Sequence, residues 1–441
     1  MEALVALTEV LRQQPRERRF GQVVTVRGQL IEVAGFGQAA PLGARLSVLA
    51  DGRAIDLEVT GLTADRLQCL SFADPRGVAA GARVELASRQ VALRPCAAWL
   101  GRVVDGLGRP VDGGGPLPQG LVAQAVRAAP PPAAERSRVG ERVATGVRAL
   151  DLFAPLCRGQ RLGLFAGSGV GKSVLMAQLA RWTDCDVAVI GLVGERGREL
   201  RDFVEEELGP EGRARSVVVV ATSDEPALMR RQAAWATLAI AEHFRDAGAH
   251  VLCVMDSVTR FAMAQREIGL ASGEPPATKG YTPTVFAELP RLLERAGPGR
   301  AGQGSITGLF TVLVDGDDHD EPIADAARGI LDGHIVMSRR IAERGRYPAI
   351  DVLRSVSRTL PACLSPDQNK LRLAARDLLS VHGDMEELVR LGAYRQGSNP
   401  DVDRAIALSP AIERLLHQDR SDLGPARDGF PDLANLLGSA S

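Results

Sequence analysis

The residues with the clearest chemical meaning lie between positions 161 and 180, where a short apolar run leads into a glycine-rich loop and then a helix-like pattern. Between a strand and a helix, the backbone N–H groups of such a loop and the helix N-terminus can bind one polyphosphate. Lys172 is expected to contact the β- and γ-phosphates, and the Ser173 hydroxyl to bind Mg²⁺. The residues expected to surround the nucleotide phosphates are Ala166, Gly167, Ser168, Gly169, Val170, Gly171, Lys172, Ser173 and Val174. Ala166 departs from the generic motif, which has glycine at this position.

Two carboxylates directly follow other apolar runs. Asp256 comes after residues 251–255, and Glu195 comes after residues 192–194. Ligands of open α/β sheets bind beyond the carboxyl ends of the strands, so both side chains are expected near the loop. Asp256 is predicted to hold Mg²⁺ or its water. Residue 257 is a serine and not a second acid, which leaves Glu195 as the candidate for polarising the attacking water.

A third apolar run ends in an acidic segment at residues 315–321. A second metal site there is conceivable from composition, but a solvated loop is the favoured interpretation. Arginines are needed as well, because phosphoryl transfer spreads negative charge over the equatorial oxygens and one guanidinium can raise the rate by about 10³- to 10⁵-fold. The contenders are Arg196, Arg260 and Arg358. Arg358 lies far along the chain from the loop, which would suit a residue delivered across a subunit boundary.

Composition limits the function classes. The 53 basic and 54 acidic residues give a net charge of −1, so no broad positive field would attract nucleic acid or anionic lipid. The six cysteines are scattered without metal-ligand spacing, which indicates buried thiols in a reducing compartment. Neither a signal segment nor a membrane-spanning run is recognisable, so a cytoplasmic location is expected.

Patterning predicts an α/β protein with several domains. Leu4, Leu7 and Leu11 indicate an amphipathic N-terminal helix within residues 1–20, and short β-type runs predict a small β-barrel over 21–93. Residues 94–365 are predicted to form the core, which starts with a Gly/Pro-rich connector at 94–150 that is expected to be largely irregular. Runs that are apolar at nearly every position predict a doubly wound parallel sheet. Residues 366–441 are predicted to be helical, with a loosely ordered tail.

Long literal strings in the chain resemble the flagellum-specific type III export ATPases, which are relatives of the rotary ATPase α and β subunits. The matching strings cover residues 101–110, 191–199, 221–226, 256–269, 273–283, 332–336, 355–358 and 385–394. The resemblance implies a RecA-like core between a barrel and a helical domain, in a homohexamer that binds ATP and Mg²⁺ at its subunit interfaces. It supports the roles of Lys172, Ser173, Glu195 and Asp256, implies that Arg358 acts in the neighbouring site, and places Tyr347 against the adenine.

The same resemblance implies the partners. They would be a regulatory, stator-like protein at the N-terminal helix, a central-stalk protein, the membrane export gate, and chaperone–substrate complexes. The chain would then work at the inner face of the cytoplasmic membrane, energising export of flagellar proteins and their release from chaperones.

Four alternatives stay open. A virulence-type secretion ATPase or a rotary ATP synthase catalytic subunit would share nearly all of the chemistry. A nucleic-acid-translocating RecA-type hexamer needs exposed aromatics on its barrel, whereas residues 21–93 contain only Phe36 and Phe72. A nucleotide-binding subunit without turnover would have no use for Glu195. A GTPase is disfavoured because Asn369-Lys370 is not followed by an acid that could bind guanine.

Overall fold

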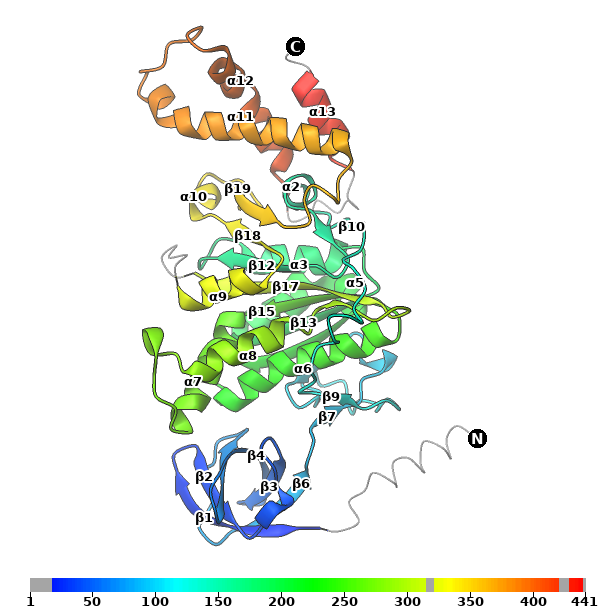
Figure 1. Cartoon of the computed structure of the whole chain (residues 1–441), viewed down its shortest axis with the longest axis vertical. Helices are drawn as coiled ribbons and strands as arrows, with labels where there is room; N and C mark the ends of the chain where they lie inside the picture. The colour runs from blue at the N-terminus through cyan, green and yellow to red at the C-terminus, as the bar shows by residue number, and fades with distance from the viewer. Residues whose placement is uncertain (1–17, 315–320, 420–427, 439–441) are drawn as a thin grey trace.

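The computed structural model of the chain describes residues 18–314, 321–419 and 428–438. Figure 1 shows three regions along the long axis: a β-barrel, a sheet covered by helices, and a group of C-terminal helices. The predicted α/β class, with a barrel before the core and helices after it, is therefore confirmed. The predicted N-terminal helix falls mostly on residues 1–17, which lie outside the described part, and Phe20 already belongs to the first strand.

The N-terminal barrel is closed by six antiparallel strands in the order β1-β2-β5-β4-β3-β6. The strands are β1 (Phe20–Arg27), β2 (Leu30–Ala34), β3 (Arg45–Ala50), β4 (Arg53–Leu62), β5 (Arg66–Ser71) and β6 (Arg83–Ser88). In β2, Ile31 and Val33 are fully buried while the residues between and beside them are only half-buried. This alternation with period two fills the barrel interior with apolar side chains.

The core contains a nine-stranded sheet whose main path runs β19-β18-β12-β17-β15-β13-β14-β8, with β16 paired to β17. The strands are β8 (Val103–Asp105), β12 (Arg161–Ala166), β13 (Val187–Glu195), β14 (Ser216–Thr222), β15 (His250–Asp256), β16 (Gly297–Pro298), β17 (Ser305–Leu313), β18 (Gly333–Met337) and β19 (Ile350–Ser357). All neighbours along the main path pair in parallel except β18 and β19. Two-residue strands β7 (Ala92–Leu93), β9 (Gln124–Ala125), β10 (Arg142–Val143) and β11 (Leu156–Cys157) form two small ladders outside it.

Both faces of this sheet are covered, which explains why its strands are apolar at nearly every position. One face packs against α6 (Ala227–Asp246), α7 (Val258–Ala271), α8 (Pro283–Leu293) and α9 (Pro322–Ile330). The other packs against α2 (Arg148–Phe153) and α3 (Lys172–Trp182), and the C-terminal helices extend that apolar cluster. In β13, Val189 belongs to the first cluster and Ile190 to the second.

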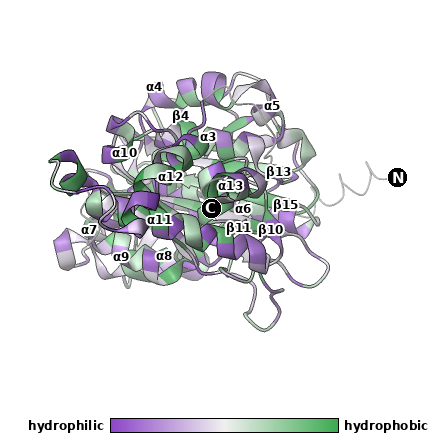
Figure 2. Ribbon diagram, turned by 90° about the horizontal axis from the view of Figure 1, so that it is seen from above, coloured by the Kyte–Doolittle hydropathy of each residue, from purple (hydrophilic) through white to green (hydrophobic). Residues whose placement is uncertain are grey.

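The C-terminal region consists of α11 (Pro366–Arg390), α12 (Pro400–Leu416) and α13 (Phe430–Gly438). Seen from above, the three helices lie over the core and carry both hydrophilic and hydrophobic segments (Figure 2). Shorter helices complete the core: α4 (Gly197–Asp202), α5 (Gly209–Ala214) and α10 (Arg339–Glu343), with a π-helical segment at Phe203–Glu207. None of the helices in the described ranges has the length and apolar character needed to cross a bilayer.

Two features differ from the sequence-based expectation. The connector at 94–150 is not merely irregular, because Val103–Asp105 adds a parallel edge strand to the core sheet next to β14. In the tail, α13 buries Phe430, Leu433 and Leu437 in the apolar cluster beneath the C-terminal helices. Burial of these side chains orders a helix where a loosely ordered tail was expected.

A buried ion pair ties the barrel to the core. Arg231 of α6 lies 2.5 Å from the carboxylate of Glu58 in β4, and both side chains are less than 5% exposed. The guanidinium of Arg127 stacks 3.7 Å from the ring of Trp235, which follows on the same helix. The barrel is thus attached to α6 by a specific ion pair as well as by the chain connection, and the connector contacts the same helix through Arg127.

Candidate active site

The glycine-rich loop occupies the carboxyl edge of the core sheet, between the end of β12 at Ala166 and the start of α3 at Lys172. Gly169 and Gly171 have φ angles of +78° and +89°, a backbone conformation that strongly favours glycine. Ala166 instead ends a strand outside the left-handed region and is 1% exposed in the apolar cluster. An alanine therefore fits the first position of the motif without strain.

Lys172, Glu195 and Asp256 converge beside this loop. The Lys172 Nζ lies 2.6 Å from Asp256 Oδ1 and 3.5 Å from Glu195 Oε1. Glu195 ends β13 and Asp256 ends β15, two adjacent parallel strands whose register pairs Leu192 with Asp256. The three predicted side chains are therefore brought together by the sheet.

Burial and charge shift the acid–base behaviour of these groups. Burial raises the pKa of Glu195, repulsion from Asp256 raises it further, and Lys172 acts in the opposite direction. Burial alone would lower the pKa of Lys172, but the carboxylates of Asp256 and Glu195 raise it above its usual value. Lys172 thus stays charged and serves as the counter-ion of both acids.

A polar cavity of about 530 Å³ opens beside these residues. Its lining includes the loop from Ala166 to Gly169, Gly171 to Val174, Glu195 and the two arginines predicted nearby, Arg196 and Arg260. Arg196 is 82% exposed and pairs with Glu199 at 3.1 Å. Arg260 also lines the cavity, and its Nη1 contacts the Met263 sulfur at 3.6 Å.

A second cavity, of about 540 Å³ and more apolar, meets the first at Gly171 and Val174. Tyr347 and Pro348 line it, and the Tyr347 ring lies 3.5 Å from where a Cβ on Gly171 would stand. The far wall comes from the C-terminal region at residues 417–419. The two cavities together suit a ligand with a polyphosphate at one end and an aromatic base at the other.

The donor set also fits Mg²⁺, which prefers hard oxygen ligands. Ser173 presents an exposed hydroxyl in the first turn of α3. Asp256 uses Oδ1 for Lys172 and for the Thr311 hydroxyl, which donates at 2.5 Å. Within the described residues its Oδ2 has no hydrogen bond, so one carboxylate oxygen remains for a metal ion.

Arg358 is the one predicted site residue that lies elsewhere. Its backbone N–H donates to the Asp332 carbonyl, and the Asp332 N–H donates to the carbonyl of Arg161, the first residue of β12. The loop begins at the other end of that six-residue strand. Since a strand rises about 3.3 Å per residue, Arg358 is on the order of 15–20 Å from the loop of its own chain.

Several residues at the site escaped the sequence analysis. Thr311 of β17 contacts Asp256, and Arg339 of α10 donates to the carbonyl of Ser168 in the loop at 3.3 Å. His417 and Gln418 bind the backbone of Tyr347: the Tyr347 N–H donates to His417 Nδ1 at 3.3 Å, and the Gln418 N–H donates to the Tyr347 carbonyl at 2.7 Å. No local motif marks these residues, because tertiary contacts alone bring them to the site.

The acidic segment at 315–321 lies almost entirely outside the described residues. Its last member, Glu321, caps α9 by accepting hydrogen bonds from the N–H groups of Ile323 and Ala324. This is an ordinary structural role for an acid at a helix N-terminus.

Comparison with known families divides the chain into two matched regions. Residues 146–357 match the nucleotide-binding domain of the ATP synthase alpha/beta family, and residues 364–434 match the C-terminal domain of the type III secretion ATPase EscN. The first region contains the glycine-rich loop, Glu195 and Asp256. The second contains residues 417–419, which form one wall of the apolar cavity.

Similar full-length proteins agree with this division. A flagellum-specific ATP synthase of Caulobacter vibrioides is 57% identical over 95% of this chain and 96% of its own length. A type 3 secretion system ATPase of Xanthomonas euvesicatoria is 47% identical over 96% of this chain and 95% of its own length.

Solved structures show the same fold. The assembled ATPase EscN of enteropathogenic E. coli superposes with a TM-score of 0.88 at 37% identity, covering 95% of this chain and all of EscN. EscN in complex with its central stalk EscO gives a TM-score of 0.85 at 36% identity, covering 95% of this chain and 99% of EscN. With this similarity along nearly its whole length, the chain belongs to the ATP synthase alpha/beta family, among the flagellum-specific ATP synthases and type III secretion ATPases.

Proposed function

We propose that this protein hydrolyses MgATP at the subunit interfaces of a homohexamer and thereby energises export of flagellar proteins and their release from chaperones. The observation that carries the proposal is the convergence of Lys172, Glu195 and Asp256 beside a glycine-rich loop, at a cavity that continues into an apolar pocket under Tyr347. A site that only held nucleotide would gain nothing from a half-buried carboxylate aimed at the phosphate end.

Each residue then has a role in phosphoryl transfer. Lys172 and the loop amides bind the β- and γ-phosphates, while Glu195 accepts a hydrogen bond from the attacking water. Ser173 and Asp256 would hold Mg²⁺, which supplies positive charge to the phosphate oxygens when bound. Arg260, which lines the cavity beside Glu195, is placed to bind the γ-phosphate from the same subunit, and Arg196 lies at the cavity rim.

Arg358 completes the site of a neighbouring subunit in this proposal. Its position at the edge of the sheet opposite to the loop favours action in trans, because no small adjustment would bring it to its own phosphates. The assembled state of EscN, and the stalk complex in which EscN was also solved, support a ring with a central-stalk partner. A regulator at residues 1–20, the membrane export gate and chaperone–substrate complexes are further proposed partners, and the place of work is the cytoplasmic face of the membrane.

The flagellar assignment is supported by the 57% identity to a flagellum-specific ATP synthase. The type 3 secretion system ATPase, at 47%, falls within the 44–48% of several other flagellum-specific relatives, so the bound partners decide between the two systems. Affinity capture from flagellated cells is expected to recover export-apparatus components of the flagellum. Recovery of injection-needle components in their place would assign the chain to the other system.

The catalytic proposal is tested with Glu195→Gln. This variant keeps shape and hydrogen bonding but loses the carboxylate, so it is expected to bind ATP as well as the parent chain while turnover falls by about 10²- to 10⁴-fold. Equilibrium binding of a fluorescent ATP analogue and phosphate-release kinetics measure the two quantities. Turnover within a fewfold of the parent would remove Glu195 from the mechanism.

A further inference from the structure

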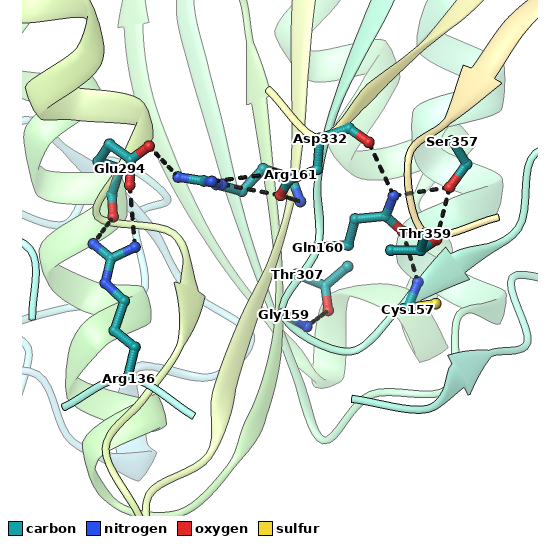
Figure 3. A network of polar contacts seen from close by, with 10 residues as sticks. All are labelled: Arg136, Cys157, Gly159, Gln160, Arg161, Glu294, Thr307, Asp332, Ser357 and Thr359. Carbon is teal, nitrogen blue, oxygen red and sulfur yellow. Dashed lines mark hydrogen bonds and ion pairs between the residues drawn. The ribbon is translucent and has the colours of Figure 1, made fainter. Parts of the chain in front are cut away.

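Arg358 is exposed, but the residues on either side of it are anchored to one buried side chain. Ser357 and Thr359 both hydrogen-bond to the amide of Gln160, which is fully buried immediately before β12 (Figure 3). Gln160 Nε2 donates to the Ser357 hydroxyl at 2.8 Å, and Gln160 Oε1 accepts from the Thr359 hydroxyl at 3.4 Å. The backbone that presents Arg358 is therefore held on both sides.

The remaining capacity of the Gln160 amide is used as well. Its Nε2 also contacts the Asp332 carbonyl at 3.3 Å, and its Oε1 accepts from the Cys157 N–H at 3.0 Å. A primary amide offers two donors and two acceptor sites, and each has a partner, the longest contact being that of the Thr359 hydroxyl, which also lies 2.9 Å from the Ser357 hydroxyl. A network that is fully satisfied in this way fixes one geometry, since any displacement leaves a buried polar group without a partner.

The next residue, Arg161, holds the turn between α9 and β18, to which Arg358 is hydrogen-bonded. Its Nε lies 3.1 Å from the Asp332 carboxylate, and its carbonyl accepts from the Asp332 N–H. The Asp332 carbonyl in turn accepts from the Arg358 N–H at 2.9 Å. Side-chain and backbone contacts therefore both fix the position of Arg358 relative to the start of β12.

We propose that Gln160 is a positioning residue for Arg358: by bonding Ser357 and Thr359 together it sets where the guanidinium meets the ATP bound in the adjacent subunit. This inference rests on the proposed function, because it requires Arg358 to act in trans. Gln160 itself touches no nucleotide, and it lies at the opposite end of β12 from the loop that binds its own subunit's phosphates.

The test replaces Gln160 by methionine, which keeps the length and approximate volume of the side chain but removes the amide. The variant Gln160→Met is expected to bind ATP with an unchanged Kd and to assemble normally, while kcat falls roughly 10- to 100-fold because Arg358 is misplaced. A merely structural defect would instead weaken ATP binding or assembly together with turnover.

Mixed rings separate the two explanations. A Gln160→Met subunit supplies an intact loop and Glu195, and a Glu195→Gln subunit supplies an intact Gln160 and Arg358. Mixing the two impaired variants is therefore expected to raise activity above that of either alone, just as mixing Arg358→Ala with Glu195→Gln should. If the Arg358→Ala mixture regains activity and the Gln160→Met mixture does not, the positioning role is wrong while the proposed function stands. If the Arg358→Ala variant alone keeps full turnover, Arg358 has no role in hydrolysis, and that part of the proposed function is wrong.

Two further variants complete the test, one as a control and one in case Gln160→Met does not fold. Thr307→Val removes a hydroxyl that accepts from the Gly159 N–H at 3.0 Å, in the same region but without contact to the Arg358 loop, and should leave kcat unchanged. Thr359→Val leaves Gln160 in place and removes only a half-buried hydroxyl. It is expected to lower kcat severalfold and to be rescued in mixed rings, which keeps the proposal testable if Gln160→Met does not fold. Equal loss of kcat in Thr307→Val, or normal kcat in both Gln160→Met and Thr359→Val, would overturn it.

Discussion

At the scale of single residues, the main feature of the site is that one lysine balances the negative charges of two acids. Lys172 faces two acids, and its side chain is only 13% exposed, so the lysine neutralises carboxylates that would otherwise be costly to bury. When a γ-phosphate draws Lys172 away, Glu195 and Asp256 lose that counter-ion. A divalent cation on Asp256 and Ser173 would then restore the balance, which explains why metal and nucleotide should bind together.

The raised pKa of Glu195 predicts the pH dependence of catalysis. In the proposed mechanism Glu195 must be ionised to orient water, and burial together with Asp256 raises its pKa above the ordinary 4.5. Turnover should therefore fall as the pH drops through this raised value, at a pH where an ordinary glutamate would still be ionised. The measurement is kcat between pH 4.5 and 9, with ATP binding to Glu195→Gln as the control for titration of the substrate. A kcat that stays flat down to pH 4.5 would contradict the prediction.

The backbone conformation of Gly194, the residue before Glu195, leads to a prediction about stability and turnover. Its φ is +74°, and a Cβ there would lie 2.8 Å from the Cβ of Arg260. Gly194→Ala should therefore destabilise the fold by about 1–3 kcal/mol and lower kcat by displacing Glu195 or Arg260. Gly197→Ala is the matched control, because its Cβ would meet nothing closer than 3.8 Å. Thermal unfolding and phosphate release measure both, and equal behaviour of the two variants would rule out the steric explanation.

At the scale of elements, the central strands β12, β13, β14, β15 and β17 were predictable because they are buried on both faces and hence apolar at nearly every position. For the same reason Glu195 and Asp256 could be found, since they end such runs. Strands β18 and β19 were not predicted, and β19 alternates buried with more exposed residues. Strand β8 could not be predicted, because its three residues are too few to show a periodic pattern. It joins the core sheet by pairing with β14. Thr311 and Gln418 reach the site through contacts across 55 residues to Asp256 and 272 residues to Gly146, which no local pattern encodes.

The segment after α12 is expected to stabilise the wall of the apolar cavity. Gln418 is 7% exposed; its amide donates to the Gly146 carbonyl at 2.9 Å and accepts from the Arg148 N–H at 2.7 Å, while its backbone binds Tyr347. Gln418→Ala loses two buried hydrogen bonds worth about 1 kcal/mol each. The KM for ATP should rise severalfold with kcat little changed.

Ser409→Ala provides the comparison, because Ser409 is equally buried in α12 but bonds Leu378, within the helical region. Its KM should match that of the parent chain. Steady-state kinetics and analogue binding test the pair. A similar rise in KM for both variants would mean that the C-terminal helices act by general stability and not through Tyr347.

At the scale of the whole molecule, the loop and Arg358 occupy opposite edges of one sheet, so in the proposed mechanism, where Arg358 acts in trans, a single chain would hold two incomplete half-sites. An isolated subunit should consequently hydrolyse ATP poorly. The rate per subunit is expected to rise with protein concentration until rings are complete, so total activity rises more steeply than linearly. Light scattering at the same concentrations reports the assembly. A rate strictly proportional to concentration, across a range where the mass changes from monomer to ring, would exclude shared sites.

The Glu58–Arg231 pair determines which parts of such a ring can flex. Separating the barrel from α6 would leave a buried charge without its partner, at a cost of about 3–5 kcal/mol. Each barrel should therefore tilt as a rigid cap with the core beneath it when that core changes nucleotide state. In the proposed hexamer, crosslinks between neighbouring barrels should therefore lower ATP turnover, whereas a crosslink between barrel and core within one subunit should not.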